Sequence, residues 1–476
     1  MGYPLLVFFL KQNHTNKGGH GLGGTNATGQ VPDFGGLRTG LIDPDTPKDA
    51  YSKMNVDGTK KMNLVFSDEF EQDGRSFYPG DDPVWQAEDL FYWGTGDLEW
   101  YDPAAITTKD GALRISLTEH VSHNKNFRSG LLSSWNKFCF TGGRIEVAVI
   151  LPGTNDVSGF WPAAWLLGNL GRQGYGATTE GMWPYSYDSC DVGTLPNQTW
   201  PAEQGGGPEA AVSGGDKQGP LSYLPGQRLS RCTCPGEDHP GPLLSDGTLR
   251  GRGAPEIDVF EVSAGKAYTA SQSLQSAPYN AKYRLPTTDG AVYYAPGRAG
   301  KNSYEGGVYQ QAVSGVSQFK SDAFEKDGAV FNVMAVEYKP GLDDDSYVAW
   351  MTDGKLAWSV HPPAMAPDKL TEIDVRPFPQ EPMYIIMNLG MSQSFSWPDW
   401  ENLEFPAHML IDYVRVYQPE GEENVGCDPP DYPTKDYIDR HIGAYTNANL
   451  TTWTEPKGLR GGYGGTFPKN RLLHKC

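Results

Sequence analysis

The chain has 476 residues, including 58 Gly and 37 Pro, and its 39 basic and 58 acidic residues give a formal net charge of −19. The acidic balance argues against nucleic acid as a partner, because phosphate binding needs a basic surface. The Gly and Pro content stays below the level typical of disordered chains and fits a loop-rich, all-β protein. The length exceeds that of a typical single domain, so we expect one large β domain with long insertions and extended termini.

The first sixty residues do not have the pattern of a globular core. Residues 3–10 are apolar, but the run is far shorter than the ~20 residues that span a bilayer. It also lacks the basic start and the small-residue cleavage site of a signal peptide. We interpret residues 1–10 as the remnant of a membrane anchor whose start is missing. Residues 11–60 are polar and Gly-rich, and we expect them to form a flexible luminal stem.

From residue 61 the pattern becomes that of a β-sandwich. Short apolar runs alternate with polar residues and are separated by Gly-containing turns, which favours an all-β sandwich or barrel. Residues 352–355 contain Asp-Gly and predict a hairpin turn. The expected strands include 64–66, 113–117, 144–150, 271–275, 331–338, 346–351, 383–389 and 409–417.

Two regions differ from this pattern. Residues from about 170 to 254 are rich in Gly and Pro, contain three cysteines and have few strand-like runs. We interpret them as an insertion pinned by disulfides, lying close to the acidic strand that follows it. Residues 421–476 are a tail that we expect to pack on the domain and to be tied to it by Cys427 or Cys476.

Cysteines and glycosylation sequons indicate an oxidising, secretory compartment. The six cysteines are even in number, which fits a disulfide framework, but the sequence does not choose between the possible pairings. Sequons ending in Thr predict glycosylation at four asparagines. They are Asn13, Asn26, Asn197 and Asn449.

The most informative stretch is residues 256–261, where three carboxylates stand among Ile, Val and Phe. This composition predicts a strand. Side chains alternate between the two faces of a strand, so Glu256 and Asp258 share a face and Glu261 would point the other way. A one-residue β-bulge between Asp258 and Glu261 would return Glu261 to the first face, and bulges often re-aim side chains near active sites.

Paired carboxylates on one face are the machinery of glycoside hydrolysis, with a separation of about 5–5.5 Å in retaining enzymes and about 6.5–9.5 Å in inverting ones. The spacing alone leaves open an exposed edge strand with solvated acids. Residues 372–375 repeat the first four letters of the acidic strand, but no third acid follows them. We interpret that copy as structural.

The 256–261 segment resembles the bulged E-x-D-x-x-E motif of glycoside hydrolase family 16, and other motifs of that family follow in order. The resemblance covers roughly residues 64–418. It implies an all-β jelly-roll sandwich with an open concave cleft, in which residues 61–420 form the catalytic domain. The other matching segments are S-D-E-F at 67–70, F-T-G-G-R-I-E at 140–146, G-F-W-P-A-A-W-L-L at 159–167 and I-D-Y-V-R-V-Y-Q at 411–418.

More narrowly, the chain resembles the fungal β-glucan-synthesis-associated proteins of cell-wall β-1,6-glucan biosynthesis. The marks of this resemblance are the insertion sequence at 183–194 and the tail sequence at 426–433. That family carries one membrane span with its catalytic-type domain in the lumen. The resemblance therefore implies a single-pass type II membrane protein of the secretory pathway, from the endoplasmic reticulum and Golgi to the plasma membrane, with a luminal or extracellular domain.

The resemblance assigns Glu256 as nucleophile and Glu261 as general acid/base, with Asp258 between them modulating their charge. A covalent glycosyl-enzyme would form on Glu256. Attack on it by water gives hydrolysis, and attack by a glucan hydroxyl gives transfer. Neighbouring negative charge raises a carboxyl pKa, so the cluster itself would help to keep one member protonated.

Aromatic residues are candidates for sugar-binding positions. Trp161 matches the cleft tryptophan of the family and is expected to stack on a sugar ring, whereas we expect Trp165 in the core. Trp93 and Trp397 lie in predicted loops and are candidates for the walls of the cleft.

Polar strand residues complete the expected site and also mark departures from the family. Asn388 and Gln275 match positions where the family places polar groups that face the cleft. Residues 331–334 read F-N-V-M where many family glucanases carry F-H-x-Y, and the S-G at 129–130 lacks the arginine that often follows. Both departures put ordinary β-1,3-glucanase specificity in doubt.

We therefore expect a retaining glycosidase or transglycosylase of fungal β-1,6-glucan biosynthesis. Two alternatives stay open, a secreted endo-β-1,3-glucanase and a non-catalytic glucan-binding scaffold or chaperone. The expected partners are a β-glucan oligo- or polysaccharide and, through the N-terminal anchor, a membrane. No cofactor and no metal site are expected, because His120 and His123 form an H-x-x-H without an evident third ligand.

Overall fold

The computed structural model of the chain describes residues 40–215, 218–265, 269–281, 290–455 and 461–476. The predicted anchor remnant at 1–10 lies outside these ranges, as do residues 11–39 of the predicted stem. Within the described ranges no helix is both long enough and apolar enough to cross a membrane.

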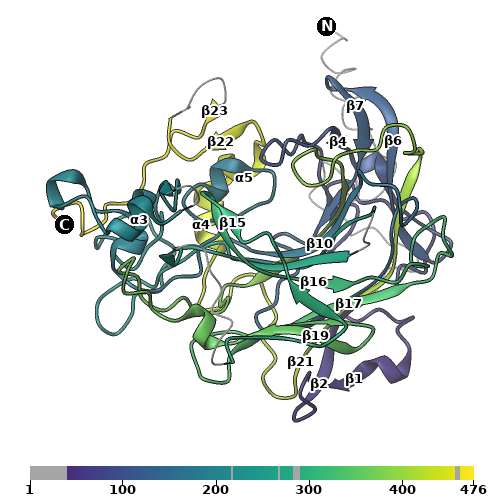
Figure 1. The fold of residues 1–476 in the computed structure, drawn as a ribbon, viewed down its shortest axis with the longest axis horizontal. Helices are drawn as coiled ribbons and strands as arrows, with labels where there is room; N and C mark the ends of the chain where they lie inside the picture. The colour runs from purple at the N-terminus through teal and green to yellow at the C-terminus, as the bar shows by residue number, and fades with distance from the viewer. Residues whose placement is uncertain (1–39, 216–217, 266–268, 282–289, 456–460) are drawn as a thin grey trace, which may run out of the picture.

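Two stacked and largely antiparallel sheets form the body of the protein (Figure 1). The first has twelve strands, in the order β13-β19-β18-β17-β9-β21-β6-β7-β4, with β1, β2 and β5 attached beside this path. Its strands are β1 (Ser52–Met54), β2 (Lys61–Asp68), β4 (Glu99–Tyr101), β5 (Ile106–Lys109), β6 (Ala112–Ser122), β7 (Lys125–Ser129), β9 (Gly143–Ile150), β13 (Val292–Tyr294), β17 (Asn332–Lys339), β18 (Tyr347–Thr352), β19 (Lys355–Val360) and β21 (Ala407–Pro419).

The second sheet has nine strands in the order β14-β16-β12-β11-β10-β20-β8-β3, with β15 paired to β16. The acidic strand is β11, in the middle of this order. The strands are β3 (Gln86–Ala87), β8 (Leu131–Ser133), β10 (Trp161–Gly168), β11 (Glu256–Ser263), β12 (Thr269–Ser276), β14 (Ala299–Lys301), β15 (Gly306–Gly307), β16 (Gln310–Gln318) and β20 (Met383–Gly390).

The predicted all-β jelly-roll sandwich is confirmed, and each strand expected from the apolar pattern lies within an observed strand or overlaps one. The predicted hairpin turn joins β18 to β19, where Thr352 pairs with Lys355. Its two central residues, Asp353 and Gly354, have φ of 46° and 71°. Left-handed values at both positions are what a tight hairpin turn requires, and Asp-Gly adopts them readily.

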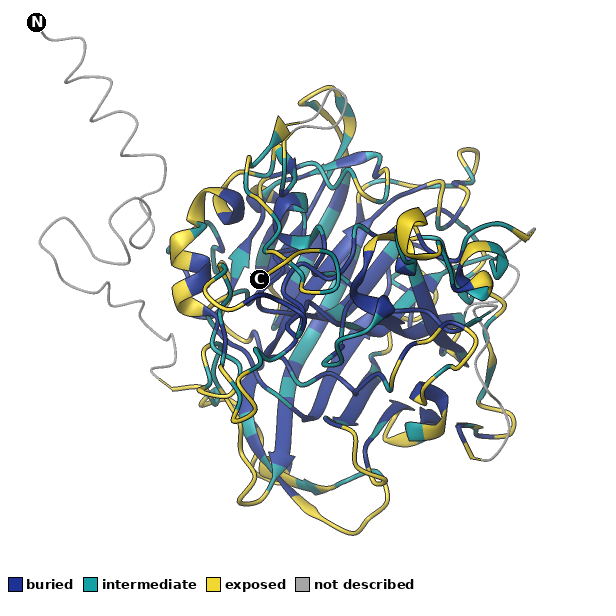
Figure 2. Cartoon of the chain, turned by 90° about the vertical axis from the view of Figure 1, so that its left-hand side faces the viewer, coloured by how far each residue is buried: buried dark blue, intermediate teal, exposed yellow. Residues whose placement is uncertain are grey.

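The main core lies between the two sheets. Alternation along β20 shows how the nine-stranded sheet divides its side chains. Met383, Ile385, Met387 and Leu389 belong to the core between the sheets, whereas Tyr384 and Ile386 belong to a second apolar cluster on the opposite face. We call this opposite face of the nine-stranded sheet the outer face. In Figure 2 much of the length of the strands is in the buried colour.

The C-terminal tail covers part of the outer face. It contains α4 (Lys435–Arg440), α5 (Ile442–Thr446) and the parallel pair β22 (Leu450–Thr452) and β23 (Gly461–Gly462). Tyr437, Tyr445 and Trp453 of the tail are buried in the second cluster together with Tyr384 and Ile386. Figure 1 shows these yellow elements beside the teal insertion.

The insertion is built of short helical turns. They are η3 (Val192–Thr194), η4 (Pro196–Gln198), η5 (Ala202–Gln204), α2 (Gly176–Thr179) and α3 (Glu209–Ser213). Other short helical turns are η1 (Lys48–Tyr51), η2 (Pro103–Ala105) and η8 (Pro362–Met365).

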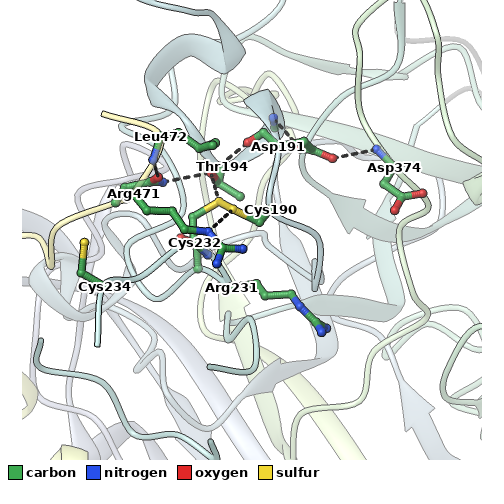
Figure 3. Close-up of a disulfide and its surroundings, with 12 residues drawn as sticks. Cys190, Asp191, Thr194, Arg231, Cys232, Cys234, Asp374, Arg471 and Leu472 are labelled. Carbon is green, nitrogen blue, oxygen red and sulfur yellow. Dashed lines mark hydrogen bonds between the residues drawn. A yellow bond between two sulfur atoms is a disulfide. The ribbon is translucent and has the colours of Figure 1, made fainter. Parts of the chain in front are cut away.

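All six cysteines pair. Cys190–Cys232 closes a loop within the insertion, Cys234–Cys476 joins the insertion to the tail, and Cys139–Cys427 joins the tail to the domain. Figure 3 shows the first of these beside Thr194 and Arg471. The insertion is thus pinned by disulfides, and both candidate tail cysteines tie the tail.

The repeated E-I-D-V sequence at 372–375 lies in a loop outside both sheets. Its Asp374 accepts a hydrogen bond from Ser189 Oγ at 2.9 Å, and its backbone N–H donates to Asp191 at 3.1 Å. Trp200 Nε1 donates to Glu372 at 3.3 Å. The copy therefore anchors the insertion, in agreement with its structural interpretation.

The prediction of a flexible stem is wrong for residues 40–60. Strand β1 pairs with β2, and Met54 O accepts a hydrogen bond from Arg144 of β9 at 3.1 Å. Lys53 Nζ forms an ion pair with Glu146 of the same strand. This segment is polar because it binds the charged surface of the twelve-stranded sheet and buries little apolar area. Its polar composition therefore did not indicate a flexible stem.

Removal of the Cys139–Cys427 disulfide is expected to destabilise the protein and loosen the start of the tail. The bond closes a sequence separation of 288 residues. Loss of such a native cross-link typically costs about 2–5 kcal/mol, because the unfolded chain regains entropy. The Cys139→Ser/Cys427→Ser protein should therefore unfold at lower denaturant, and limited proteolysis should cut it first near the start of the tail. An unchanged unfolding midpoint would contradict a stabilising role of this disulfide.

Candidate functional site

The three carboxylates share the outer face because β11 contains a bulge. Asp258 pairs with Ser273 of β12, and Glu261 pairs with Ser271. Ser271 and Ser273 are two residues apart and face the same way, so their partners do as well. The register against β10 shifts at the same place, where Val259 is the extra residue. The predicted bulge between Asp258 and Glu261 is confirmed.

Core packing holds the bulge in place. Ile257, Val259, Phe260 and Val262 are all buried in the core between the sheets. Two side chains from the core side bind the backbone carbonyls at the irregularity. Gln272 Nε2 donates to Val259 O at 3.1 Å, and Trp350 Nε1 donates to Asp258 O at 2.8 Å. These bonds satisfy carbonyls that a disrupted strand ladder leaves without partners.

Each glutamate of the cluster accepts a hydrogen bond from an indole. Trp161 Nε1 donates to Glu261 Oε1 at 2.9 Å, and Trp183 Nε1 donates to Glu256 Oε2 at 2.6 Å. An indole N–H can only donate, so each bond favours the ionised carboxylate. Both glutamates are partly exposed.

Asp258 is the buried member of the cluster, with 2% of its surface exposed. Its Oδ2 accepts hydrogen bonds from Ser273 Oγ and from Gln275 Nε2. Gln275 also stands opposite Glu256 in the β11–β12 register. Two fixed donors hold Asp258 in one orientation between the glutamates.

Burial and mutual repulsion raise the pKa values of the cluster. Burial, followed by the charge of Asp258, raises the pKa of Glu261 to about 8. Burial and the charges of Asp258 and Glu261 raise the pKa of Glu256 well above its usual range. Burial also raises the pKa of Asp258, although the bonds from Ser273 and Gln275 oppose this. Carboxylates this close do not all ionise together, so the cluster retains a proton near neutral pH.

Trp161 lies beside the cluster on the outer face. Its ring stacks on Phe395 with centroids 4.3 Å apart and planes 4° apart. One face of the indole is thus covered by protein. The loop that carries Phe395 also carries Trp397, which is 68% exposed and whose backbone carbonyl accepts a hydrogen bond from Ser158.

Asn388 lies across the outer face from Glu261, with Ala163 of β10 between them in the register. Its Oδ1 accepts a hydrogen bond from Trp165 Nε1 at 2.9 Å, and its Nδ2 donates to Tyr101 OH at 3.1 Å. Trp165, which we expected in the core, lies on the outer face opposite Asp258, because it is four residues from Trp161 on β10. It is partly exposed and packs against the second apolar cluster.

A second pair of carboxyl groups is buried behind Tyr101. Burial raises the pKa of Asp97 to about 6, and burial together with the charge of Asp97 raises that of Glu99 well above its usual range. The Glu99 carboxylate accepts the backbone N–H of Met391. This pair therefore anchors the start of the loop that carries Phe395 and Trp397.

Trp93 contacts α2, where the insertion meets the tail. A Cβ added at Gly176 would come within 2.7 Å of both the Trp93 ring and Thr451 O. Only a glycine in α2 permits this close approach. Trp93 is thus part of the junction of α2 with β22.

Several residues of the site were not predicted from the sequence. Trp183 sits at the start of the insertion, 73 positions before Glu256. Tyr304 follows Asn302, which donates to Ser271, the register partner of Glu261. Burial and the charges of all three carboxylates raise the pKa of Tyr304. Phe395 stacks on Trp161. The W-P pair at 183–184 was the one available signal, and Tyr304 and Phe395 lie in loops without a motif.

The four predicted glycosylation positions divide into two groups. Asn197 and Asn449 are exposed. Asn13 and Asn26 lie outside the described residues.

The comparison with known families then identifies the chain. A family model described as Beta-glucan synthesis-associated protein SKN1/KRE6/Sbg1 matches residues 1–476. The chain belongs to this family.

Individual relatives agree with the family match. Beta-glucan synthesis-associated protein KRE6 of Saccharomyces cerevisiae is 46% identical over 455 residues, which cover 94% of this chain and 58% of that protein. Beta-glucan synthesis-associated protein SKN1 of Candida albicans is 44% identical over 444 residues, or 93% of this chain and 56% of that protein. The chain spans little more than half the length of these curated relatives.

Among solved structures, the catalytic domain of an endo-1,3-beta-glucanase (laminarinase) from Thermotoga petrophila aligns with a TM-score of 0.43 at 20% identity. The alignment covers 76% of this chain and 100% of that one.

Replacing Trp183 by Phe is expected to raise the pKa of Glu256. The substitution keeps an aromatic ring but removes a donor that favours the ionised carboxylate. Carbon-detected NMR titration of the labelled carboxyl groups would follow the change. Trp200→Phe is the matched control, because Trp200 also lies in the insertion and donates to a glutamate, Glu372, far from the cluster. Equal titration curves in both variants would contradict the role of Trp183.

Glu261→Gln is expected to stabilise the fold increasingly as pH rises. The folded pKa of Glu261 is about 8, whereas an unfolded glutamate has a pKa of about 4.3. Stability from the neutral carboxyl is therefore complete below pH about 4.3 and is lost as pH rises through about 8. Thermal unfolding of variant and wild type should diverge between these limits. The Glu372→Gln substitution, at an exposed residue, should show no such divergence. A difference in unfolding temperature between Glu261→Gln and wild type that stays constant with pH would refute the raised pKa of Glu261.

Proposed function

We propose that the protein is a glucan-active retaining glycosidase or transglycosylase of fungal cell-wall β-1,6-glucan biosynthesis. The observation that carries the proposal is the bulge at Val259, which brings Glu256, Asp258 and Glu261 to one face. Membership of a β-glucan synthesis-associated family supports a glucan as the substrate class. A site with two accessible glutamates and one buried aspartate supports double displacement.

In the proposed first step, Glu256 attacks the anomeric carbon of the bound sugar. The glycosidic bond breaks as the new bond to the Glu256 oxygen forms, and Glu261 gives its proton to the leaving oxygen. The Trp161 indole occupies only Oε1 of Glu261, which leaves Oε2 for that proton. A pKa of about 8 keeps Glu261 protonated near neutral pH.

In the second step, Glu261 acts as a base. It takes a proton from water or from a glucan hydroxyl, whose oxygen attacks the glycosyl-enzyme and frees Glu256. Water as the attacking group gives hydrolysis, and a glucan hydroxyl gives transfer. Asp258 is held by Ser273 and Gln275, and its charge raises the pKa of both glutamates. The charge of Asp258 therefore favours a proton held on the pair of glutamates, and the proposed first step needs that proton on Glu261 while Glu256 is ionised.

The location is part of the proposal. Three disulfides with no free cysteine support an oxidising compartment. We place the domain in the secretory pathway, on the luminal or extracellular side, held by an N-terminal membrane anchor. Asn13, Asn26, Asn197 and Asn449 are the proposed glycosylation positions, and the exposure of Asn197 and Asn449 supports the last two.

Azide rescue tests the assigned roles. Glu256→Ala and Glu261→Ala should each lower turnover of β-glucan oligosaccharides by about a hundredfold or more. Azide should restore turnover of both, giving an α-glycosyl azide with Glu256→Ala and a β-glycosyl azide with Glu261→Ala. NMR of the products distinguishes the two anomers. Glu372→Ala, in the structural copy of the motif, is the matched control and should keep full activity. Azide products of the same anomer in both variants would exclude a retaining pair.

Product analysis and cell-wall analysis separate the alternatives. Elongated products from a β-glucan oligosaccharide indicate transfer, whereas shortened products alone indicate a hydrolase such as an endo-β-1,3-glucanase. Cells that carry Glu256→Gln should lose wall β-1,6-glucan. Unchanged wall β-1,6-glucan in those cells would mean that the protein acts without catalysis, as a scaffold or chaperone.

A further inference from the structure

Three exposed tyrosines lie near the carboxylates, at the end of the nine-stranded sheet where β16 begins. Tyr304 is 49% exposed, Tyr309 is 59% exposed and Tyr223 is 52% exposed. Tyr304 and Tyr309 lie next to β15 and β16, and Tyr223 belongs to the insertion. We call these three residues the tyrosine ledge. Rings of this size are seldom left this exposed without a function when several gather at one place.

Tyr304 connects the ledge to the carboxylate cluster. The loop before it is fixed to β12, where Asn302 Nδ2 donates to Ser271 Oγ at 3.2 Å. Ser271 is the register partner of Glu261. The charges of Glu261, Glu256 and Asp258 all act on the Tyr304 phenol. The ledge therefore begins beside the site and is continuous with it.

Gln310 connects Tyr304 to the outer part of the ledge, because its Nε2 donates to Tyr304 OH at 2.5 Å. Tyr309 precedes Gln310 directly at the start of β16. Strand β16 lies two positions from β11 in the sheet, a separation of roughly 10 Å. Tyr309 is thus too far from the carboxylates to touch the bond being cleaved, but it is close enough to contact the same polymer chain.

Tyr223 brings the insertion onto this end of the sheet. Its backbone N–H donates to Val308 O at 2.7 Å, and its ring meets that of Tyr309 edge to face with centroids 6.1 Å apart. This contact restricts both side chains, which lowers the side-chain entropy lost when a ligand binds. An insertion tied by disulfides thus supplies half of an aromatic pair.

The chemistry of the ledge favours a polysaccharide. Every ring in it is a tyrosine, which combines a flat apolar face with a hydroxyl that can donate and accept. Its neighbours Asn302 and Gln310 are amides. A polymer of sugar rings presents C–H faces and hydroxyls in the same alternation.

We propose that the tyrosine ledge is a remote subsite that binds a distal part of the β-glucan chain whose reacting bond lies at the carboxylates. This inference rests on the proposed function of the carboxylate site and adds a length requirement to it. Long chains that reach Tyr223 and Tyr309 bind more tightly than short chains that end at Tyr304.

Binding to a protein that cannot turn over tests the ledge. Calorimetry on the Glu256→Gln protein would compare a disaccharide with an octasaccharide, in both the β-1,6-linked and the β-1,3-linked series. Adding Tyr223→Ala and Tyr309→Ala should weaken octasaccharide binding about tenfold, the size of one good aromatic contact, and leave disaccharide binding unchanged. Tyr309→Phe should retain most of the affinity. Tyr293→Ala is the matched control, because Tyr293 is equally exposed but lies on β13 of the other sheet.

The outcomes separate the ledge from the proposed function. Octasaccharide affinity that survives both alanine substitutions overturns the ledge, and so does an equal loss for the disaccharide. In active protein the same pair of substitutions should raise KM for long glucan about tenfold with kcat unchanged, which a folding defect would not do. Wild-type turnover with no length effect overturns the ledge alone. A protein that neither binds nor turns over any glucan overturns the proposed function and the ledge together.

Discussion

The bulge at Val259 is the constraint on which the rest of the site depends. A regular strand would place Phe260 on the outer face and Glu261 in the core. Instead, Val259 and Phe260 are consecutive and both completely buried. Burying both apolar side chains requires one extra residue in the strand, and that residue returns Glu261 to the side of Glu256 and Asp258. The chemistry of the outer face and the packing of the inner face thus require the same irregularity.

A cluster of three acids lowers the stability of the fold, and hydrogen bonds from the surrounding residues offset part of this loss. Gathering three carboxyl groups in a partly buried place raises their pKa values and disfavours their ionised forms. Two indoles, a serine and an amide donate to the cluster, and they come from three different parts of the chain, namely β10, the insertion and β12. Gln272 and Trp350 donate hydrogen bonds to the backbone carbonyls at the bulge from the core side, and Trp350 belongs to the other sheet. The result is a fixed group of acids in which protonation is shared.

The insertion and the tail are part of the functional face. Trp183 reaches Glu256, Tyr223 packs on Tyr309, and the tail covers the outer face around Tyr384. Disulfides tie these segments to each other and to the domain. A sandwich of the two sheets alone would leave this side of the nine-stranded sheet open. In this family member, long-range cross-links therefore shape the surface on which the carboxylates lie.

The sequence by itself determined the strands, the acidic face and the bulge, because these depend on periodicity within a few residues. It also identified Glu256, Asp258 and Glu261 as one cluster. Only the tertiary structure decided the disulfide pairs, the ordered segment at 40–60, the exposure of Trp165 and the proximity of Trp183 and Tyr304 to the acids. Each of these depends on contacts between segments far apart in the chain, and local periodicity carries no information about such contacts. The bulge was predictable because both of its causes, alternating acids and adjacent buried apolar residues, lie within a single strand.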